Sequence, residues 1–199
     1  MDYHTIDKGL HFTRGRAISD HDLVFWASDS NYRINLSNEE VRRLITEERW
    51  DTLYEHDQLN LGMLAGETFR FYNEGRIQFP PTYKFDNGTD QYDTSEKQRV
   101  PAWTDRILYR GQGIKLLEYS SANLKMSDHR PVHASFVVQC RIVEEAKREQ
   151  MAKEIYEKRK NVIGDVLSGN VEKFVDFNEK RKYFSYPILA NNSTSTIIR

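Results

Sequence analysis

The chain has 199 residues, 38% hydrophobic and 30% charged, a composition that fits one globular domain with a polar appendage. Its formal net charge of −1 excludes a global basic field, so any anionic ligand needs a local cluster of Lys and Arg. No run approaches the roughly 18 apolar residues of a membrane-spanning helix, and the N-terminus lacks the basic and apolar regions of a secretory signal. We therefore expect a cytoplasmic protein whose membrane association, if any, is peripheral.

The single cysteine, Cys140, excludes an internal disulfide and is typical of a reducing compartment. It follows an apolar, strand-like run, which predicts a buried structural thiol. A catalytic thiol is the less favoured alternative.

Apolar runs and helix signals predict the first elements. The continuous apolar run at 23–27 indicates a buried central strand. Ser37 and Glu40 form a capping box, which predicts a helix over about 38–49. Residues 79–103 form a long polar loop, and loops of that length inside a domain are usually functional.

Three more strands are predicted before residue 140, with a glycine turn at 111–113 between the first two of them. Strands mixed with helices and turns of unequal length indicate an α/β (α+β) sandwich. The predicted strands are residues 107–110, 114–119 and 131–138.

The character of the chain changes after residue 141. Residues 142–164 predict a long solvated helix, because opposite charges recur four residues apart, as in Glu144 and Arg148. We expect a charged helical extension over 141–177 and a flexible tail over 178–199.

Polar residues cluster after the predicted strand at 23–27. Asp29 and Asn31 are separated by one residue, which places a carboxylate and an amide on the same side of an extended chain. The carboxylate can take a proton from water while the amide holds a phosphate oxygen. The alternative is an ordinary polar turn.

Two further clusters flank later strands. Asp105 precedes a strand, where a buried carboxylate can accept a hydrogen bond from a histidine ring and fix its tautomer. The alternative is a surface pair between Asp105 and Arg106. Asp128 stands beside His129, so the imidazole can be held charged and stabilise negative charge that grows on phosphorus. The alternative is a loop histidine without a catalytic role.

Together these segments resemble the inositol polyphosphate 5-phosphatases, particularly the synaptojanin-like branch. The W-x-G-D-x-N-Y/F-R signature of that family falls on residues 25–33, R-x-P-A-W-T-D-R-I-L on 99–108, and S-D-H-R-P-V on 127–132. The segments 79–86 and 92–97 are similar to the family too. The resemblance covers roughly residues 10–140.

The resemblance implies Mg²⁺-dependent hydrolysis in the DNase I-like (endonuclease/exonuclease/phosphatase) fold. It assigns proton transfer from water to Asp29, the scissile phosphate to Asn31, transition-state stabilisation to His129, orientation of that ring to Asp105, and a place close to the metal to Asp128. A second group is implied to bind the neighbouring ring phosphate, and charge-assisted hydrogen bonds suit that task. These substrate-binding residues are Tyr83, Lys84, Lys97 and Arg99.

Two departures from the family pattern matter. Ser28 replaces the usual glycine, which costs roughly 1–2 kcal/mol if the backbone needs a positive φ. The metal-binding glutamate and second histidine of the family lie upstream of anything in this sequence. We therefore expect residues 1–140 to be the C-terminal half of the catalytic domain, impaired alone, with an uncovered sheet edge and apolar surface.

The expected partner is a phosphoinositide lipid at a membrane surface or a soluble inositol polyphosphate. One alternative is a fragment that binds phosphoinositides without hydrolysing them. The other is a related phosphoesterase that acts on nucleic acid, which the basic residues Lys84, Lys97 and Arg99 argue against because they match the inositol-directed branch.

Overall fold

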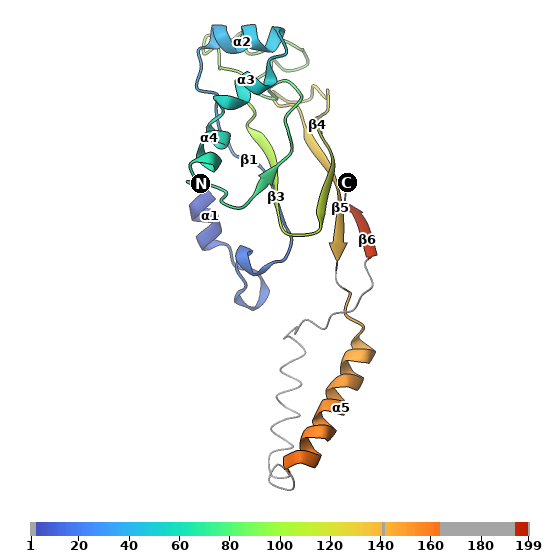
Figure 1. Cartoon of the computed structure of the whole chain (residues 1–199). Coiled ribbons are helices and arrows are strands. Elements are labelled where there is room, and N and C mark those ends of the chain that lie inside the picture. Colours follow the sequence, from blue (N-terminus) through green and yellow to red (C-terminus); the bar gives the residue numbers. More distant parts are fainter. Residues whose placement is uncertain (1–2, 141, 164–193, 199) are drawn as a thin grey trace. The chain divides into compact units, whose positions relative to one another are not determined.

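The computed structural model describes residues 3–140, 142–163 and 194–198 (Figure 1). The chain divides into two compact units, Met1–Val138 with Thr196–Arg199 and Gln139–Ser195. Among the described residues, no helix is both long and apolar enough to cross a membrane.

The elements in chain order are α1 (Tyr3–Gly9), the short 3₁₀ helices η1 (Thr13–Gly15) and η2 (Ile18–Asp20), β1 (Val24–Asp29), α2 (Asn38–Thr46), α3 (Trp50–Glu55), α4 (Gln58–Leu64), β2 (Asn73–Glu74), β3 (Asp105–Arg110), β4 (Ile114–Ser121), β5 (Val132–Cys140), α5 (Glu145–Ile163) and β6 (Thr194–Ile198).

The strands form two three-stranded sheets, in the orders β1-β3-β2 and β4-β5-β6. Strand β1 pairs antiparallel with β3 from Val24 opposite Arg110 to Asp29 opposite Asp105. The predicted strands are confirmed, and the glycine turn joins β3 of one sheet to β4 of the other. Helices and two sheets together give the expected α/β sandwich class.

The strand predicted at 23–27 is present as β1, but the prediction that it is buried and central in its sheet is wrong. Within the described residues β1 lies at the edge of its sheet, because it pairs with β3 alone. Its apolar side chains border an open cavity of about 450 Å³ that Leu10, Phe12 and Ile18 also line. The apolar run is therefore half-buried in this structure.

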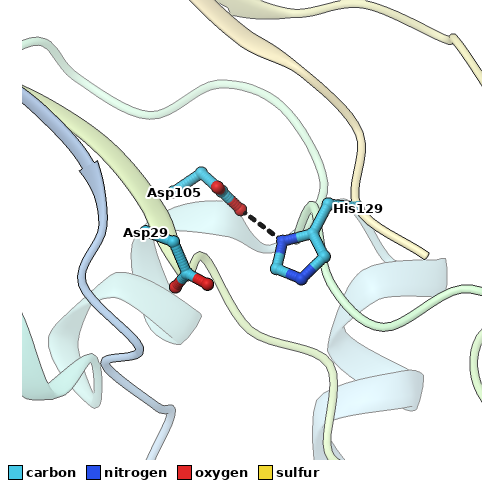
Figure 2. Close-up of side chains that lie close together, drawn as sticks. All are labelled: Asp29, Asp105 and His129. Atoms are coloured by element: carbon cyan, nitrogen blue, oxygen red, sulfur yellow. Dashed lines mark hydrogen bonds and ion pairs between the residues drawn. The ribbon is translucent and has the colours of Figure 1, made fainter. Parts of the chain in front are cut away.

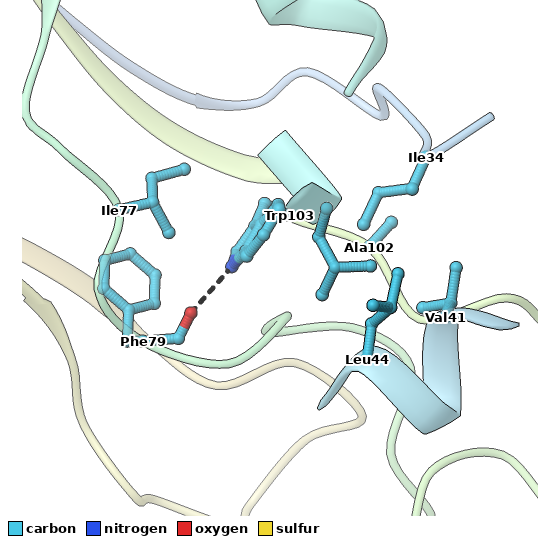
Figure 3. Close-up of a cluster of buried hydrophobic side chains, with 8 residues drawn as sticks. Ile34, Val41, Leu44, Ile77, Phe79, Ala102 and Trp103 are labelled. Atoms are coloured by element: carbon cyan, nitrogen blue, oxygen red, sulfur yellow. Dashed lines mark hydrogen bonds between the residues drawn. The ribbon is translucent and has the colours of Figure 1, made fainter. Parts of the chain in front are cut away.

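A hydrophobic core beside the sheet fixes α2 and both ends of the 79–103 loop (Figure 3). Trp103 is fully buried there, and its indole nitrogen donates to the Phe79 carbonyl at 3.1 Å. Ser37 accepts from the backbone N–H of Glu40 at 3.2 Å, as the capping signal predicted. The core residues are Ile34, Val41, Leu44, Leu53, Ile77, Phe79, Ala102 and Trp103.

The loop between Phe79 and Trp103 has no helix or strand, as predicted. Hydrogen bonds within the loop and to α2 nevertheless fix its backbone. The buried Asp93 carboxylate accepts from the backbone N–H groups of Ser95 at 3.1 Å and Arg99 at 2.9 Å. Arg42 of α2 donates to the Asp93 carbonyl at 2.9 Å. These bonds let an irregular segment present polar side chains in fixed positions.

Arg106 lies in the interior, so the alternative of a surface pair with Asp105 is wrong. Its guanidinium makes two 2.7 Å bonds to Glu74 of β2 and one 2.9 Å bond to Asp57, which caps α4. The hydroxyl of Tyr119 on β4 donates to Glu74 at 3.0 Å. This network joins β3 to β2, β4 and the start of α4. The two carboxylates compensate the guanidinium charge, so that it can be buried.

The second unit contains α5, a long charged helix within the predicted extension, and residues 164–177 of that extension lie outside the described residues. Arg148 pairs with Glu145 at 2.8 Å instead of the predicted Glu144. Cys140 is exposed, so the predicted buried thiol is wrong: it ends β5 two residues beyond Val138, the last buried position of that strand. Within the predicted flexible tail, Thr194–Ile198 instead form β6, and residues 178–193 lie outside the described residues.

Candidate active site

Two strand ends place a pair of carboxylates side by side. Asp29 is the last residue of β1, and Asp105 opposite it is the first of β3. Asn31 follows with a φ of 55°, a left-handed conformation that asparagine tolerates better than most residues. Its backbone N–H donates to the Asp29 carboxylate at 3.0 Å, which holds the two predicted residues together.

His129 completes the cluster from the loop before β5 (Figure 2). Its Nδ1 lies 2.7 Å from Oδ2 of Asp105, which also accepts from the Thr104 hydroxyl at 2.9 Å. Side-chain ligand atoms of Asp29, Asp105 and His129 all lie within 4.8 Å of one another. The structure thus brings these predicted residues to one point, with the other ring nitrogen of His129 directed away from Asp105 (Figure 2).

Tyr83 and Arg33 extend the cluster. The Tyr83 ring lies 4.6 Å from the His129 ring, centroid to centroid. The Arg33 guanidinium lies 4.8 Å above the Tyr83 ring and donates to the Asn31 side-chain oxygen. Sequence reasoning did not single out Arg33, although it ends the first motif, or Thr104, which lies within the second. Their positions in those motifs were the available signals.

Asp128 does not join this cluster. Its carboxylate lies 3.2 Å from the Lys84 ammonium and also accepts from the Ser127 hydroxyl at 3.2 Å. Partial burial acts to raise the pKa of Asp128, but the hydrogen bonds from Lys84 and Ser127 outweigh it and lower that pKa. Asp128 therefore has a cationic partner in Lys84, and its expected place close to the metal stays a prediction.

The remaining predicted residues, Lys97 and Arg99, lie exposed in the long loop. Asp93 fixes the backbone of Arg99, and the negative charge of Asp93 also acts on Lys84. In the described part of the chain, neither side chain is brought into contact with Asp29 or His129.

Ser28 causes no strain. It belongs to β1, pairs with Arg106 and has no positive φ, so the glycine of the family pattern is not required here. Its hydroxyl accepts from the indole N–H of Trp26 at 3.0 Å and hydrogen-bonds the Ser30 hydroxyl at 2.9 Å. The substitution therefore adds hydrogen bonds beside Asp29.

Two three-stranded sheets with a carboxylate–histidine cluster at the strand ends fit the class of DNase I-like folds. Residues 1–135 match the family described as Endonuclease/Exonuclease/phosphatase family 2. The chain belongs to this family, and it is homologous to the inositol polyphosphate 5-phosphatases.

Similar proteins share this part of the chain. Phosphatidylinositol 4,5-bisphosphate 5-phosphatase INP51 of Saccharomyces cerevisiae is 52% identical over 158 residues, which cover 79% of this chain and 17% of that protein. Synaptojanin-1 of Homo sapiens is 41% identical over 183 residues, covering 77% and 12%. The chain thus spans less than a fifth of the length of either relative.

A solved structure also matches this chain and belongs to the same family. The inositol polyphosphate 5-phosphatase domain of spsynaptojanin, in complex with inositol (1,4)-bisphosphate and calcium ion, matches with a TM-score of 0.72 and 50% identity. The match covers 81% of this chain and 48% of that one. A Cimex nitrophorin in its ferrous NO complex also matches, with a TM-score of 0.55 and 33% identity over 65% of this chain.

Proposed function

We propose that this chain is part of a phosphatase that removes the 5-phosphate from inositol polyphosphates, including phosphatidylinositol polyphosphates. The observation that carries the proposal is the Asp105–His129 pair, with the Asp29 carboxylate inside the same 4.8 Å cluster. The names of the relatives and the inositol (1,4)-bisphosphate of the solved domain support it, since a 1,4-bisphosphate remains when a 1,4,5-trisphosphate loses its 5-phosphate.

In this proposal water attacks phosphorus, the bond between phosphorus and the ring oxygen breaks, and the ring oxygen takes up a proton and leaves as the inositol hydroxyl. Asp29 orients the water and accepts its proton. The Asn31 side-chain oxygen is held by Arg33, which leaves the amide N–H groups free to donate to a phosphate oxygen. His129, kept in one tautomer by Asp105, stabilises the negative charge that develops in the transition state.

A divalent cation fits beside the cluster, where Asp29 adds negative charge while its carboxylate stays available to the attacking water. Mg²⁺ prefers oxygen ligands and is usually held by one or two carboxylates, waters and substrate phosphate. Asp29 is exposed, whereas Asp105 and His129 satisfy each other at 2.7 Å. A cation held there supplies positive charge that neutralises the phosphate. The calcium ion of the solved domain supports a divalent cation, and we propose Mg²⁺, with further ligands from the upstream part of the domain.

Substrate choice is proposed to come from the 79–103 loop. Lys84, positioned by Asp128, and the exposed Lys97 and Arg99 supply cationic donors for a phosphate on the neighbouring ring carbon. Tyr83 packs between His129 and Arg33, so it sets the distance from the loop to the reacting phosphate. We expect cytoplasmic activity on a lipid or a soluble inositol polyphosphate, without a nucleic-acid substrate.

A non-catalytic phosphoinositide-binding role is the second candidate. The match covers only 48% of the solved 5-phosphatase domain, and a nitrophorin shares the fold, so the fold alone does not decide activity.

The test joins this chain to the preceding half of the 5-phosphatase domain of a close relative and measures phosphate release from soluble inositol 1,4,5-trisphosphate with Mg²⁺. We expect hydrolysis by the joined domain, none by the 199-residue polypeptide alone, and none after Asp29→Ala or His129→Ala. His133→Ala is the matched control, because His133 is an exposed histidine on β5 outside the cluster. Binding without hydrolysis in the joined domain would favour the second candidate.

A further inference from the structure

Arg42, in the middle of α2, directs its guanidinium at the 79–103 loop. Its Nη2 donates to the Asp93 carbonyl at 2.9 Å, and its Nη1 donates to the Tyr92 carbonyl at 3.4 Å. The guanidinium carbon also lies 5.9 Å from the centre of the Tyr92 ring. A planar guanidinium presents its donors in a rigid fork, so it can hold two neighbouring carbonyls at once. Arg42 therefore fixes two consecutive residues of the loop.

Asn38, one helical turn before Arg42, makes a second contact between α2 and the loop. Its side-chain oxygen accepts from Nε of Arg42 at 2.6 Å, which holds the guanidinium in place. Its side-chain nitrogen donates to the Gln98 carbonyl at 2.5 Å. The helix is anchored independently, because Val41 and Leu44 are buried in the hydrophobic core. The loop is therefore attached at two points to a helix whose position the core sets.

Asp93 connects this support to the predicted phosphate-binding residues. Its backbone N–H donates to the Lys84 carbonyl at 2.9 Å. Its carboxylate accepts from the backbone N–H groups of Ser95 at 3.1 Å and Arg99 at 2.9 Å. Arg42 holds the carbonyl of the same residue, which is 1% exposed. A shift of Asp93 therefore moves the backbone of Lys84 and Arg99 with it.

Arg42 reaches these residues through their backbone. Its donors point to main-chain carbonyls and to Asn38, and the residue is partly buried. Lys97 and Arg99 are exposed on the loop, so an anion can approach them. The helix thus holds the backbone of the loop while the loop presents the cations.

We propose that Arg42 is a positioning residue for the subsite that binds the phosphate beside the scissile one. It sets where the backbone of Lys84 and Arg99 lies, and hence how tightly the site binds two adjacent phosphates. The inference rests on the proposed function and adds a residue that lies outside the family signatures. The effect belongs to KM and not to kcat, because the contacts of Arg42 lead to the loop, whereas the carboxylate–histidine cluster is built on strand ends.

Steady-state kinetics of the joined domain tests the proposal with two soluble substrates. One is inositol 1,4,5-trisphosphate, and the other carries the 5-phosphate but no 4-phosphate. Arg42→Ala should raise KM for the trisphosphate by about fivefold, a change typical of residues coupled in one hydrogen-bond network. It should leave kcat and the second substrate nearly unchanged. Arg43→Ala is the matched control, because Arg43 is the next residue of α2 and pairs with Glu47 on the helix surface. An unchanged KM, or equal losses on both substrates, overturns the proposal.

Arg42→Lys separates the geometry of the contact from its charge. Lysine keeps the positive charge but lacks the rigid fork, so KM for the trisphosphate should rise nearly as much as with alanine. In a Lys84→Ala/Arg99→Ala background, Arg42→Ala should add little, because the residues through which it acts are gone. Full activity of Arg42→Lys, or an undiminished effect of Arg42→Ala in that background, would show that Arg42 acts by its charge alone and refute the positioning role.

Amide hydrogen exchange supplies a readout that needs no hydrolysis. The backbone amides of Ser95 and Arg99 should exchange faster in the Arg42→Ala joined domain than in the unmodified one, and Arg43→Ala should leave them unchanged. Normal hydrolysis with unchanged exchange of these amides in Arg42→Ala refutes the role of Arg42 only. Absence of hydrolysis of both substrates by the unmodified joined domain refutes the proposed function, so the two failures are distinguishable.

Discussion

Nδ1 of His129 lies 2.7 Å from Oδ2 of Asp105, although 24 positions separate the two residues in the chain. Asp105 begins β3 in one sheet, and His129 precedes β5 in the other, so the pair joins the ends of strands from different sheets. A carboxylate at that distance keeps the proton on Nδ1 and fixes the direction of Nε2. The pair therefore positions the ring before any substrate binds.

Asp105→Asn should lower kcat of the joined domain while leaving KM nearly unchanged. The amide keeps the shape of the side chain but no longer fixes the proton on Nδ1, so His129 loses the orientation with which it stabilises the transition state, and loss of one such interaction costs roughly 10²- to 10³-fold in rate. Steady-state kinetics on soluble inositol 1,4,5-trisphosphate measures the split. Asp51→Asn, at an exposed aspartate of α3, is the control. A rise in KM with an unchanged kcat would assign Asp105 to substrate binding instead.

Lys84→Ala should raise KM for a substrate with a phosphate beside the scissile one. The hydrogen bond to Asp128 raises the pKa of Lys84, so the ammonium stays charged at neutral pH and available to an anion. Because a hydrogen bond between an ammonium and a phosphate is charge-assisted, a rise in KM of at least about tenfold is expected.

Two comparisons sharpen this prediction. A substrate that lacks the neighbouring phosphate should show no difference between the Lys84→Ala variant and the unmodified joined domain. Lys115→Ala, at an exposed lysine of β4, should behave as the unmodified protein on both substrates. Equal effects of Lys84→Ala on the two substrates would show that Lys84 does not recognise the neighbouring phosphate.

The sequence predicted the cluster of the site because its signals are local. Asp29 and Asn31 follow an apolar strand, Asp105 begins one, and His129 precedes one, so each strand end carries its polar group to the same region. The resemblance to a family supplied the pairing of Asp105 with His129, which no local pattern contains.

The errors concern residues whose partners are distant in sequence. Nothing in the sequence near Arg106 points to Glu74 and Asp57, 32 and 49 positions away, so an exposed pair with Asp105 remained an open alternative. The family resemblance placed Asp128 close to the metal, which stays a prediction, and no sequence pattern indicated that the fold brings Lys84 to its carboxylate at 3.2 Å. In both cases the partner of the charged side chain is set by tertiary contacts. The alternation of apolar and polar residues along a strand carries no information about such partners.

Asp93→Asn should make the free energy of unfolding less dependent on pH in the acid range. Hydrogen bonds from the backbone of Arg99 and from Ser95 lower the pKa of Asp93 from 3.8 to about 2. The folded chain therefore binds this proton less tightly than the unfolded chain, so stability falls as the pH drops from about 4 to about 2. Thermal unfolding across that range measures the slope. An unchanged slope in the variant would mean that other carboxylates cause the acid loss.

Arg106→Met should destabilise the fold far more than Arg76→Met, although each arginine makes a two-pronged contact with a carboxylate. Arg106 and its partners Asp57 and Glu74 are almost completely buried, so removal of the cation leaves two carboxylates without compensation. Breaking a buried pair in this way costs about 3–5 kcal/mol. Arg76 and Asp51 are each 68% exposed, so water screens their charges and the pair contributes little to stability.

Urea unfolding of the two variants beside the unmodified protein measures the difference. Consecutive residues of a strand point to opposite faces, so Asp105 faces the site while Arg106 faces the core. Arg106→Met should therefore mainly lower the free energy of unfolding. The activity per folded molecule should fall less than after Asp105→Asn. Equal and small losses from both methionine substitutions would show that water reaches Glu74 and Asp57 and that the network is not a dry ion cluster.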